Sequence, residues 1–294
     1  MKVYGKKITL FLIDGVPDGR IWCELSNWTG KAYKIPRMLL SSSSDRKELH
    51  KPGVYLLLGK NEENRFQVYI GEAENIFNRL KQHLSEKDFW HEVICFISKD
   101  DNLNKAHIKY LERKLFDWAK EAKKYEIVNS SQPSKPKISE ADRAEIEEFG
   151  EIIKLLTNTL GHKVFEKIIN REKSQENYVF KISGARGTDA YGVPTSNGFV
   201  VFKGSKIAQE AVRSFPATSA KLRNTLIESG IISEQDNGLI FTQDYEFTSP
   251  SAAAAVVMGR SANGLIEWKL ENGTTLKEFE LKNKDTERLK DEIS

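Results

Sequence analysis

The sequence predicts an α+β protein of two domains, and three observations support this prediction. The chain has 294 residues, and at about 100–200 residues per domain this length indicates roughly two domains. Its 39% hydrophobic and 10% aromatic residues suffice for packed cores and exclude a disordered or collagenous chain. Short apolar runs of strand length alternate with longer segments of helical period.

Cysteine content and hydropathy exclude further classes of protein. Cys23 and Cys95 are the only cysteines and lie far apart in the sequence, which excludes a cysteine zinc site and a disulfide framework and indicates a reducing compartment. No run approaches the roughly 18 apolar residues of a membrane span, and the first residues do not resemble a secretory leader. We therefore expect a cytoplasmic protein without a membrane partner.

The positive charge is concentrated in the first half of the chain. Residues 1–50 carry nine Lys and Arg against five Asp and Glu, and residues 51–140 carry sixteen against fourteen. The remaining residues carry twenty against 23, for a net charge of +3. This distribution permits a polyanionic partner such as DNA but is no strong basic signature.

The N-terminal segment 1–50 is predicted to be a β extension. Residues 7–13 have the composition of a buried strand that ends at a turn, Asp14-Gly15. A second short strand is expected over 21–25.

A β-hairpin is expected next. Strands over 53–58 and 66–70 flank a polar loop. If the hairpin is symmetric about residue 62, Tyr55 pairs with Tyr69, and the alternating apolar residues fill the opposite face. Those apolar residues are Val54, Leu56, Leu58, Phe66, Val68 and Ile70.

A helix over 75–84 and a strand over 92–97 follow the hairpin. Arg79 and His83 are four residues apart, so both side chains lie on one face of this helix.

A long helix is predicted over 104–124. Glu112 lies at the edge of its buried stripe, with Lys105 and Lys109 on nearly the same face. A short strand over 126–128 then leads to Asn129.

The second half of the chain has a different organisation. Residues 138–176 are predicted to form a helical connector, 177–281 a second small α+β domain, and 282–294 a charged tail. Strands are expected over 178–182, 198–202 and 266–270, and helices over 205–212, 219–229 and 249–258.

The polar residues of the first half make up a set that phosphodiester cleavage requires. Tyr or His can accept a proton from an attacking water. A guanidinium can offset the charge that develops on the phosphate. One carboxylate can hold a hydrated Mg²⁺, which acts as a Lewis acid.

Two short motifs and four residues after them resemble the GIY-YIG nuclease superfamily. Gly53-Val54-Tyr55 and Val68-Tyr69-Ile70-Gly71 resemble its two signatures. Four further residues match in order: Arg79, ten residues after the second tyrosine, then His83, Glu112 and Asn129. The resemblance covers about residues 50–132.

This resemblance implies that residues 51–137 form a small antiparallel three-stranded sheet flanked by helices. It also implies a metal-dependent DNA endonuclease, with Mg²⁺ or Mn²⁺ on Glu112. By the same resemblance Tyr55 acts as or orients the general base, and Tyr69 positions the water or the phosphate. Arg79 binds the scissile phosphate.

The remaining matched residues have subsidiary roles in this scheme, and the chain departs from the family at two positions. His83 and Asn129 would support the site. Val54 replaces the common isoleucine, and Glu72 stands where some members have lysine. Lys105 or Lys109 would then supply contacts to nucleic acid.

The C-terminal domain carries a second resemblance. The run from Ser249 to Gly259, with Trp268-Lys269 and Gly273-Thr274-Thr275-Leu276, looks like a small uncharacterised bacterial domain. That domain occurs at the end of such nucleases and in some restriction-associated proteins. It brings no chemistry of its own, and a protein partner could bind there.

Ordinary structural roles stay open for each residue taken alone. A strand tyrosine commonly packs, Arg79 could pair with Glu72 or Glu74, and an asparagine suits a turn. The alternative function is a non-cleaving nucleic-acid-binding or interaction protein of a DNA repair or defence system. Cutting both strands of a duplex with one site needs either two protomers or two successive events.

Overall fold

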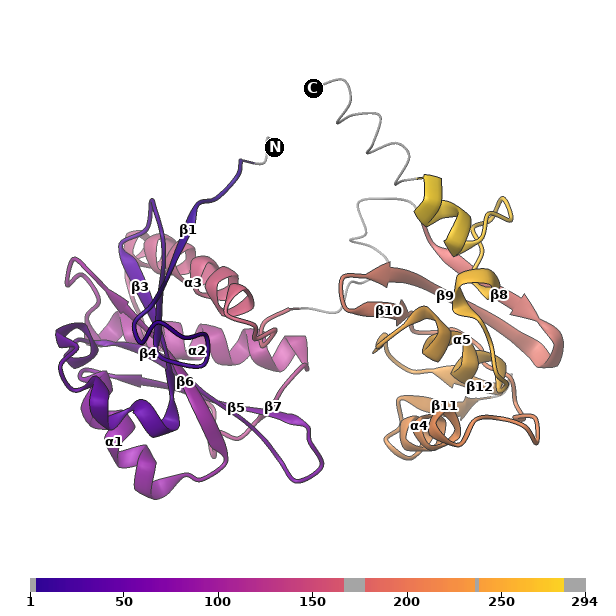
Figure 1. Cartoon of the computed structure of the whole chain (residues 1–294), viewed down its shortest axis with the longest axis horizontal. Helices are drawn as coiled ribbons and strands as arrows, with labels where there is room; N and C mark the ends of the chain where they lie inside the picture. Colours follow the sequence, from indigo (N-terminus) through magenta and orange to yellow (C-terminus); the bar gives the residue numbers. More distant parts are fainter. Residues whose placement is uncertain (1–3, 167–177, 236–237, 283–294) are drawn as a thin grey trace. The chain divides into compact units, whose positions relative to one another are not determined.

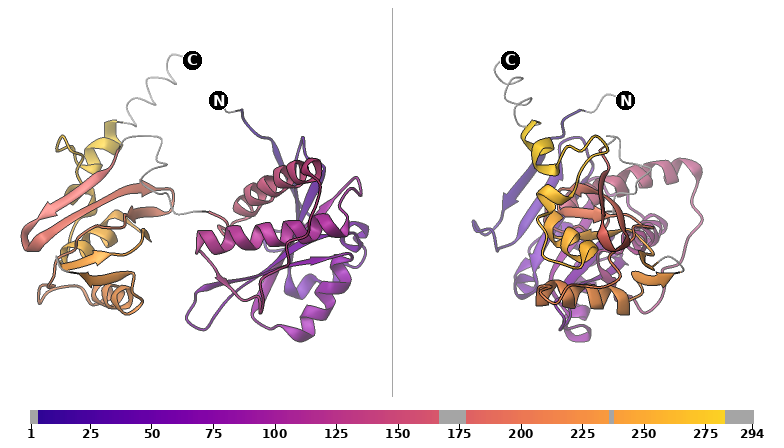
Figure 2. Two further views of the ribbon diagram at one scale, coloured as in Figure 1. Left: turned by 180° about the vertical axis from the view of Figure 1, so that it is seen from behind. Right: turned by 90° about the vertical axis from the view of Figure 1, so that its right-hand side faces the viewer.

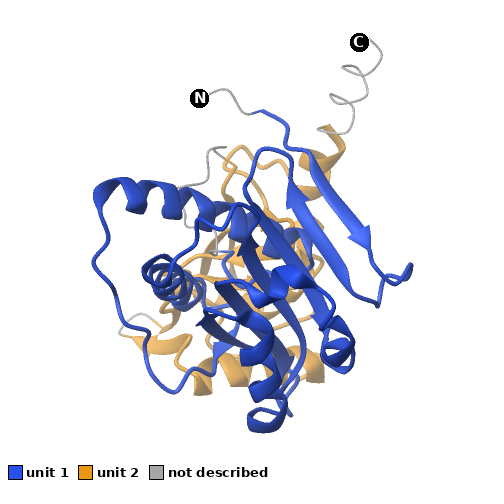
Figure 3. Ribbon diagram, turned by 90° about the vertical axis from the view of Figure 1, so that its left-hand side faces the viewer, with its two compact units in different colours: residues 1–167 blue, residues 168–294 orange. Residues whose placement is uncertain are grey.

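The computed structural model describes residues 4–166, 178–235 and 238–282 (Figure 1). It confirms the α+β class. The chain divides into two compact units, residues 1–167 and 168–294 (Figure 3). Residues 283–294 of the expected charged tail, 282–294, lie outside the described residues. The same is true of 167–176, the last part of the expected connector.

Unit 1 combines one large sheet with helices on both of its faces. Its elements are β1 (Ile8–Leu12), β2 (Ile21–Leu25), β3 (Gly30–Pro36), η1 (Arg37–Leu39), η2 (Ser41–Ser43), η3 (Lys47–His50), β4 (Gly53–Lys60), β5 (Phe66–Ala73), α1 (Ile76–Glu86), β6 (Trp90–Ser98), α2 (Lys105–Ala122), β7 (Glu126–Ile127) and α3 (Glu140–Thr159), where η denotes a short 3-10 turn.

The sheet of unit 1 has seven strands in the order β1-β2-β3-β6-β4-β5-β7. The expected antiparallel three-stranded sheet is present as its centre, and the expected N-terminal β extension is part of the same sheet. β6, β4 and β5 form the antiparallel centre. β3 pairs with β6 over its whole length, from Gly30–Ser98 to Pro36–Glu92. The free edge of β6 thus lets the N-terminal strands extend the same sheet.

Each face of the sheet is covered by its own layer of helices (Figure 2). α2 and α3 pack on one face, and α1 with the three short η turns packs on the other. The apolar side of α3, including Ile146, Phe149 and Ile153, is buried in the first of these layers. Its residues 140–159 therefore belong to unit 1, and the prediction of a connector is wrong for them.

β1 is an edge strand, not the buried strand that its composition predicts. Leu10 and Phe11 remain 46% and 51% exposed. The apolar run satisfies strand propensity, but among the described residues β1 pairs only with β2, and only its two ends, Ile8 and Leu12, pack against the core.

The β4–β5 hairpin is centred on residue 63, so the predicted pairing of Tyr55 with Tyr69 is wrong. Tyr55 pairs with Gly71, and Leu57 pairs with Tyr69. The loop spans five residues, 61–65, and Asn64 in it adopts a left-handed conformation with φ of 63°. Because the partner moves by two positions, both tyrosines still lie on one face.

The apolar residues of the hairpin follow the prediction with one exception. Val54, Leu56, Leu58, Val68 and Ile70 are buried together beneath α2 and α3. Phe66, at the end of the strand, is 47% exposed.

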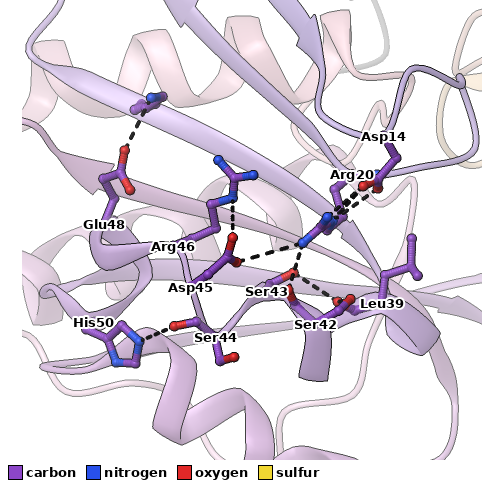
Figure 4. Close-up of polar contacts among 11 residues, drawn as sticks. Asp14, Arg20, Leu39, Ser42, Ser43, Ser44, Asp45, Arg46, Glu48 and His50 are labelled. Atoms are coloured by element: carbon purple, nitrogen blue, oxygen red, sulfur yellow. Dashed lines mark hydrogen bonds and ion pairs between the residues drawn. The ribbon is translucent and has the colours of Figure 1, made fainter.

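A polar network ties the β1–β2 turn to the η segment (Figure 4). Arg20 forms an ion pair with Asp14 at 2.6 Å and donates from Nη1 to the carbonyl oxygen of Ser42 at 2.8 Å. This network anchors the segment that covers the α1 face of the sheet.

Unit 2 contains a four-stranded sheet, order β13-β10-β9-β8, and a β11–β12 hairpin. Its elements are β8 (Phe180–Gly184), η5 (Ala185–Gly187), β9 (Thr188–Thr195), β10 (Gly198–Val201), α4 (Ala217–Glu228), β11 (Ile232–Gln235), β12 (Gly238–Phe241), β13 (Tyr245–Phe247), α5 (Pro250–Met258) and α6 (Gly264–Glu267).

Two of the elements predicted for unit 2 are wrong. The segment 205–212 is not a helix, because the main chain of Lys206 forms bridges to Asp189 and Ile240. The segment 266–270 is not a continuous strand, because its first two residues belong to the short helix α6 and only Lys269 forms β-bridges, to Lys181 and Thr275. The helices predicted over 219–229 and 249–258 are confirmed as α4 and α5.

Within the described residues, no helix is both long and apolar enough to cross a membrane.

Candidate active site

The residues that carry the resemblance described under Sequence analysis lie along one edge of the unit 1 sheet. β7 pairs with Gln67 and Val68 of β5 alone, so in the described part of the chain the second half of β5, from Tyr69 onward, has no further strand on that side. Side chains from both faces of the sheet can therefore meet at this edge.

Tyr55 lies beneath α1, where its side chain is 1% exposed. Its hydroxyl lies 2.8 Å from Nε2 of His83, which is fully buried. Burial, with the nearby Tyr69, raises the pKa of Tyr55 above its ordinary range. The phenol is therefore protonated at neutral pH and can donate to the imidazole.

His83 is poised as a neutral acceptor. Burial, followed by the positive charges of Arg79 and Lys87, lowers the pKa of His83 to about 4. Its Nδ1 lies 3.4 Å from Oε2 of Glu86 and has no hydrogen bond to any described residue. His83 is therefore not an exposed residue of the α1 surface, since its ring lies in the core beside the Tyr55 hydroxyl.

Tyr69 and Arg79 complete this side of the site. The Tyr69 ring lies 6.3 Å from that of Tyr55 and 5.3 Å from that of His83, measured between centroids. Burial disfavours the Arg79 cation, but the hydroxyls of Tyr55 and Tyr69 outweigh this effect and raise the pKa of Arg79. Arg79 donates to Oε1 of Gln82 at 2.8 Å, not to Glu72 or Glu74.

Glu112 approaches from α2, on the other side of the sheet edge. Burial, and then the negative charge of Glu72, raise the pKa of Glu112 to about 7, although Lys109 and Arg79 oppose this shift. Burial also raises the pKa of Glu72, against the effects of Lys109 and Lys105. Two partly desolvated carboxylates thus share one region with Lys109.

These two carboxylates are the groups that could hold a divalent cation. Carboxylate oxygens are hard ligands that suit Mg²⁺ or Mn²⁺, and a cation would relieve the repulsion that raises the pKa of Glu112. No three His, Cys, Asp or Glu side chains converge as a metal-binding group among the described residues. The donor set thus fits a Mg²⁺ ion that keeps several of its waters.

Asn129 acts as a clamp on the main chain of β5. Its Oδ1 accepts from the amide of Ile70 at 3.0 Å, and its Nδ2 donates to the carbonyl oxygen of Ile70 at 2.7 Å. The side-chain amide thereby continues the pairing that β7 ends, and it fixes the neighbouring Tyr69.

Gly71 is required by the position of Tyr55. A Cβ atom at residue 71 would lie 2.4 Å from the Tyr55 hydroxyl oxygen. The glycine of the second motif thus makes room for the tyrosine of the first, its cross-strand partner.

The structure therefore brings most of the sequence-matched residues together. Tyr55, Tyr69, Arg79 and His83 form one group, Glu112 lies within electrostatic reach of Tyr55 and Arg79, and Asn129 holds the strand between them. Lys109 lies beside Glu112, whereas Lys105 forms an exposed ion pair with Glu74 at 2.7 Å.

Sequence reasoning missed three side chains around this group. Gln82 holds Arg79, Glu86 faces His83, and Lys87 lies 4.6 Å from the Tyr69 ring centroid. Gln82 follows Arg79 by three residues, and Glu86 follows His83 by three. Residues at this spacing are neighbours on a helix surface, so the sequence could have indicated both contacts.

Comparison with known proteins gives a match for one part of the chain. Residues 180–280 match the family model described as "Domain of unknown function (DUF4357)". This range lies within unit 2 and covers the segment expected to be an uncharacterised accessory domain. No curated protein and no solved structure matches the chain.

Proposed function

We propose that this protein is a divalent-metal-dependent DNA endonuclease whose active site lies in unit 1, in a domain of the GIY-YIG type. The observation that carries the proposal is the convergence of Tyr55, Tyr69, Arg79, His83 and Glu112 on one edge of the sheet, from four different elements.

Tyr55 and His83 together form a proton relay in this proposal. The Tyr55 hydroxyl donates to Nε2 of a neutral His83. An attacking water can pass a proton to the Tyr55 oxygen while Tyr55 passes its own proton to His83. Neither side chain then has to carry a charge in the resting state, which suits their burial.

Arg79 supplies the positive charge. Its guanidinium can donate two parallel hydrogen bonds to phosphate oxygens. A bound phosphate also offsets the positive charge that helps to lower the pKa of His83. Substrate binding would therefore make His83 a better base when it is needed.

Glu112, with Glu72 beside it, would hold the metal ion. A divalent cation bound there would stabilise the negative charge on the leaving oxygen. Tyr69, fixed through the Asn129 clamp, would orient the water or the phosphate.

Nicking of supercoiled plasmid in Mg²⁺ or Mn²⁺ tests the proposal. We expect Glu112→Gln and Arg79→Lys to lower the nicking rate by about 10²–10³, the usual cost of losing one group that stabilises transition-state charge. Glu74→Gln is the matched control, because it makes the same change at an exposed carboxylate at the end of β5, and it should stay within about threefold of wild type.

Equal nicking by wild type and Glu112→Gln would contradict the proposal. Absence of cleavage of single-stranded, duplex and branched DNA would do so too. Salt-dependent binding without cleavage would instead favour a non-cleaving DNA-binding protein.

A further inference from the structure

A second feature of unit 1 lies at the tip of the β4–β5 hairpin, where α2 ends. A surface hollow of about 520 Å³ opens there between β5, β7 and the last turn of α2. Phe66, Ala119 and Tyr125 contribute apolar surface to it. The Phe66 and Tyr125 rings lie 5.0 Å apart, and the Tyr125 hydroxyl lies 3.2 Å from Nδ1 of His162. The aromatic floor of the hollow is therefore held in place.

The charged residues that line the hollow are mostly positive. Four cationic side chains line it against one lining carboxylate, Glu126, although one of the four, Arg65, forms an ion pair with Glu63. The cations are Arg65, Lys120, Lys123 and Lys124. Oε2 of Glu126 accepts hydrogen bonds from the side-chain amides of Asn61 and Gln67, which spread its negative charge. The field in the hollow thus favours an anion.

The aromatic floor of the hollow offers an apolar contact surface. One side of the Phe66 ring contacts Tyr125, and Nζ of Lys60 lies 4.8 Å from its centroid. The ring nevertheless stays 47% exposed, so it offers apolar surface to a ligand. A floor of this kind can contact deoxyribose while the surrounding cations contact the phosphates on either side.

The hollow lies beside the candidate active site, along the same elements. Phe66 precedes Ile70, the residue clamped by Asn129, by four residues of β5, which is about 13 Å. Lys120 follows Glu112 by eight residues of α2, which is about 12 Å. Successive phosphates of one strand of B-form DNA rise by about 3.4 Å along the helix axis, so this separation, taken along that axis, spans about four phosphates.

We propose that this hollow binds the phosphodiester backbone of DNA about four nucleotides to one side of the candidate active site. The identity of the bound polymer rests on the proposed function; the position, charge and apolar floor of the hollow do not.

The test is DNA binding in EDTA, where metal-dependent cleavage does not occur, measured with fluorescently labelled duplex DNA over a range of NaCl concentrations. The test variant is Lys120→Gln/Lys124→Gln. Its matched control is Lys6→Gln/Lys7→Gln, which removes two exposed charges beside β1, five strands and about 24 Å across the sheet from β5. Thermal melting of both variants checks that each is folded.

We expect the test variant to bind about tenfold more weakly than wild type. The slope of log K against log salt should fall by about 2, because each phosphate contact contributes about 0.9. The control should keep the wild-type affinity and slope. Equal effects of the two double variants, an unchanged slope in the test variant, or absence of DNA binding by wild type would each overturn the inference.

The binding measurement, taken together with the nicking assay, separates this inference from the proposed function. If Glu112→Gln nicks like wild type but Lys120→Gln/Lys124→Gln loses affinity, only the nuclease proposal fails. If nicking depends on Glu112 but Lys120→Gln/Lys124→Gln binds like its control, only the assignment of the hollow fails.

Discussion

Arg223 in unit 2 and His83 in unit 1 are both buried polar side chains, but their surroundings differ. Arg223 is 5% exposed and donates to the carbonyl oxygens of Val256 at 3.0 Å, of Ala208, and of Gln209 at 3.3 Å. These three partners all belong to the main chain. His83 is fully buried, with one nitrogen on the Tyr55 hydroxyl and the other without a hydrogen bond to a described residue.

This difference separates a structural role from a chemical one. A buried polar group whose donors are satisfied by main-chain carbonyls holds segments together and has little left to offer a ligand. A buried group with an unused nitrogen costs stability, and a protein tolerates that cost most often where the group performs chemistry. Burial lowers the pKa of both side chains, yet only His83 thereby becomes neutral at pH 7.

The largest expected effect on stability is at Arg223. Arg223→Ala should lower the unfolding free energy of unit 2 by about 3–5 kcal/mol, because it leaves three carbonyl oxygens without their donor and opens a cavity. Hydrogen exchange measured by mass spectrometry on the full chain reports each unit separately, and β9 and β10 should lose protection while β4 and β5 keep it.

Arg213 provides the control for this prediction. It is exposed, so Arg213→Ala should cost no more than about 0.5 kcal/mol. Similar losses at both arginines would mean that the buried contacts of Arg223 are not what holds unit 2 together.

Local patterns in the sequence predicted much of the secondary structure but not how the strands associate. Period and turn residues located β4, β5, β6, α1 and α2 to within a few residues. They gave no information on whether β3 pairs with β6, since that contact joins residues about 60 positions apart. The same limit applies to β1, whose apolar composition predicts a strand but not its exposure at the edge of the sheet.

The candidate site was predictable as a list of residues but not as an arrangement. The helical spacing placed Arg79 and His83 on one face, and alternation placed Tyr55 and Tyr69 together. Burial of His83 depends on a hydrogen bond to Tyr55, 28 residues earlier, which no local pattern shows. The Asn129 clamp likewise depends on where β7 stops.

The second prediction compares glycines in the two units. A Cβ at Gly71 would lie 2.4 Å from the Tyr55 hydroxyl oxygen, and one at Gly192 would lie 2.4 Å from a ring carbon of Phe199 and 2.3 Å from the carbonyl oxygen of Val200. Gly71→Ala and Gly192→Ala should each cost about 1–3 kcal/mol, because both overpack a buried strand. The measurement is urea unfolding of both variants.

Nicking should distinguish these two variants even though their stabilities fall together. Only Gly71→Ala displaces Tyr55, so only this variant should lose activity under conditions where both are folded. Full activity in folded Gly71→Ala would show that the position of the Tyr55 ring is not critical, and would weaken the contrast between the two units.

The smallest expected effect is the pH dependence that Glu112 confers on stability. Its pKa of about 7 in the folded protein is higher than its ordinary value of 4.5. The folded state therefore binds the proton more tightly than the unfolded state does, and the resulting stability is present below pH 4.5 and lost as the pH rises through 7. Glu112→Gln removes this titration. The variant should match wild type near pH 4 and exceed it by about 1–2 kcal/mol above pH 7, after allowance for solvent screening.

Urea unfolding at a series of pH values in EDTA measures this difference, with Glu74→Gln expected to stay within about 0.5 kcal/mol of wild type throughout. Addition of Mg²⁺ at pH 8 should then stabilise wild type but not Glu112→Gln, because a ligand that binds only the folded state stabilises it by mass action. A pH-independent difference between Glu112→Gln and wild type would mean that the Glu112 carboxylate is as well solvated as an exposed one. In that case the burial of Glu112 would not lower the stability of unit 1. Only His83 would then remain as a contrast to Arg223.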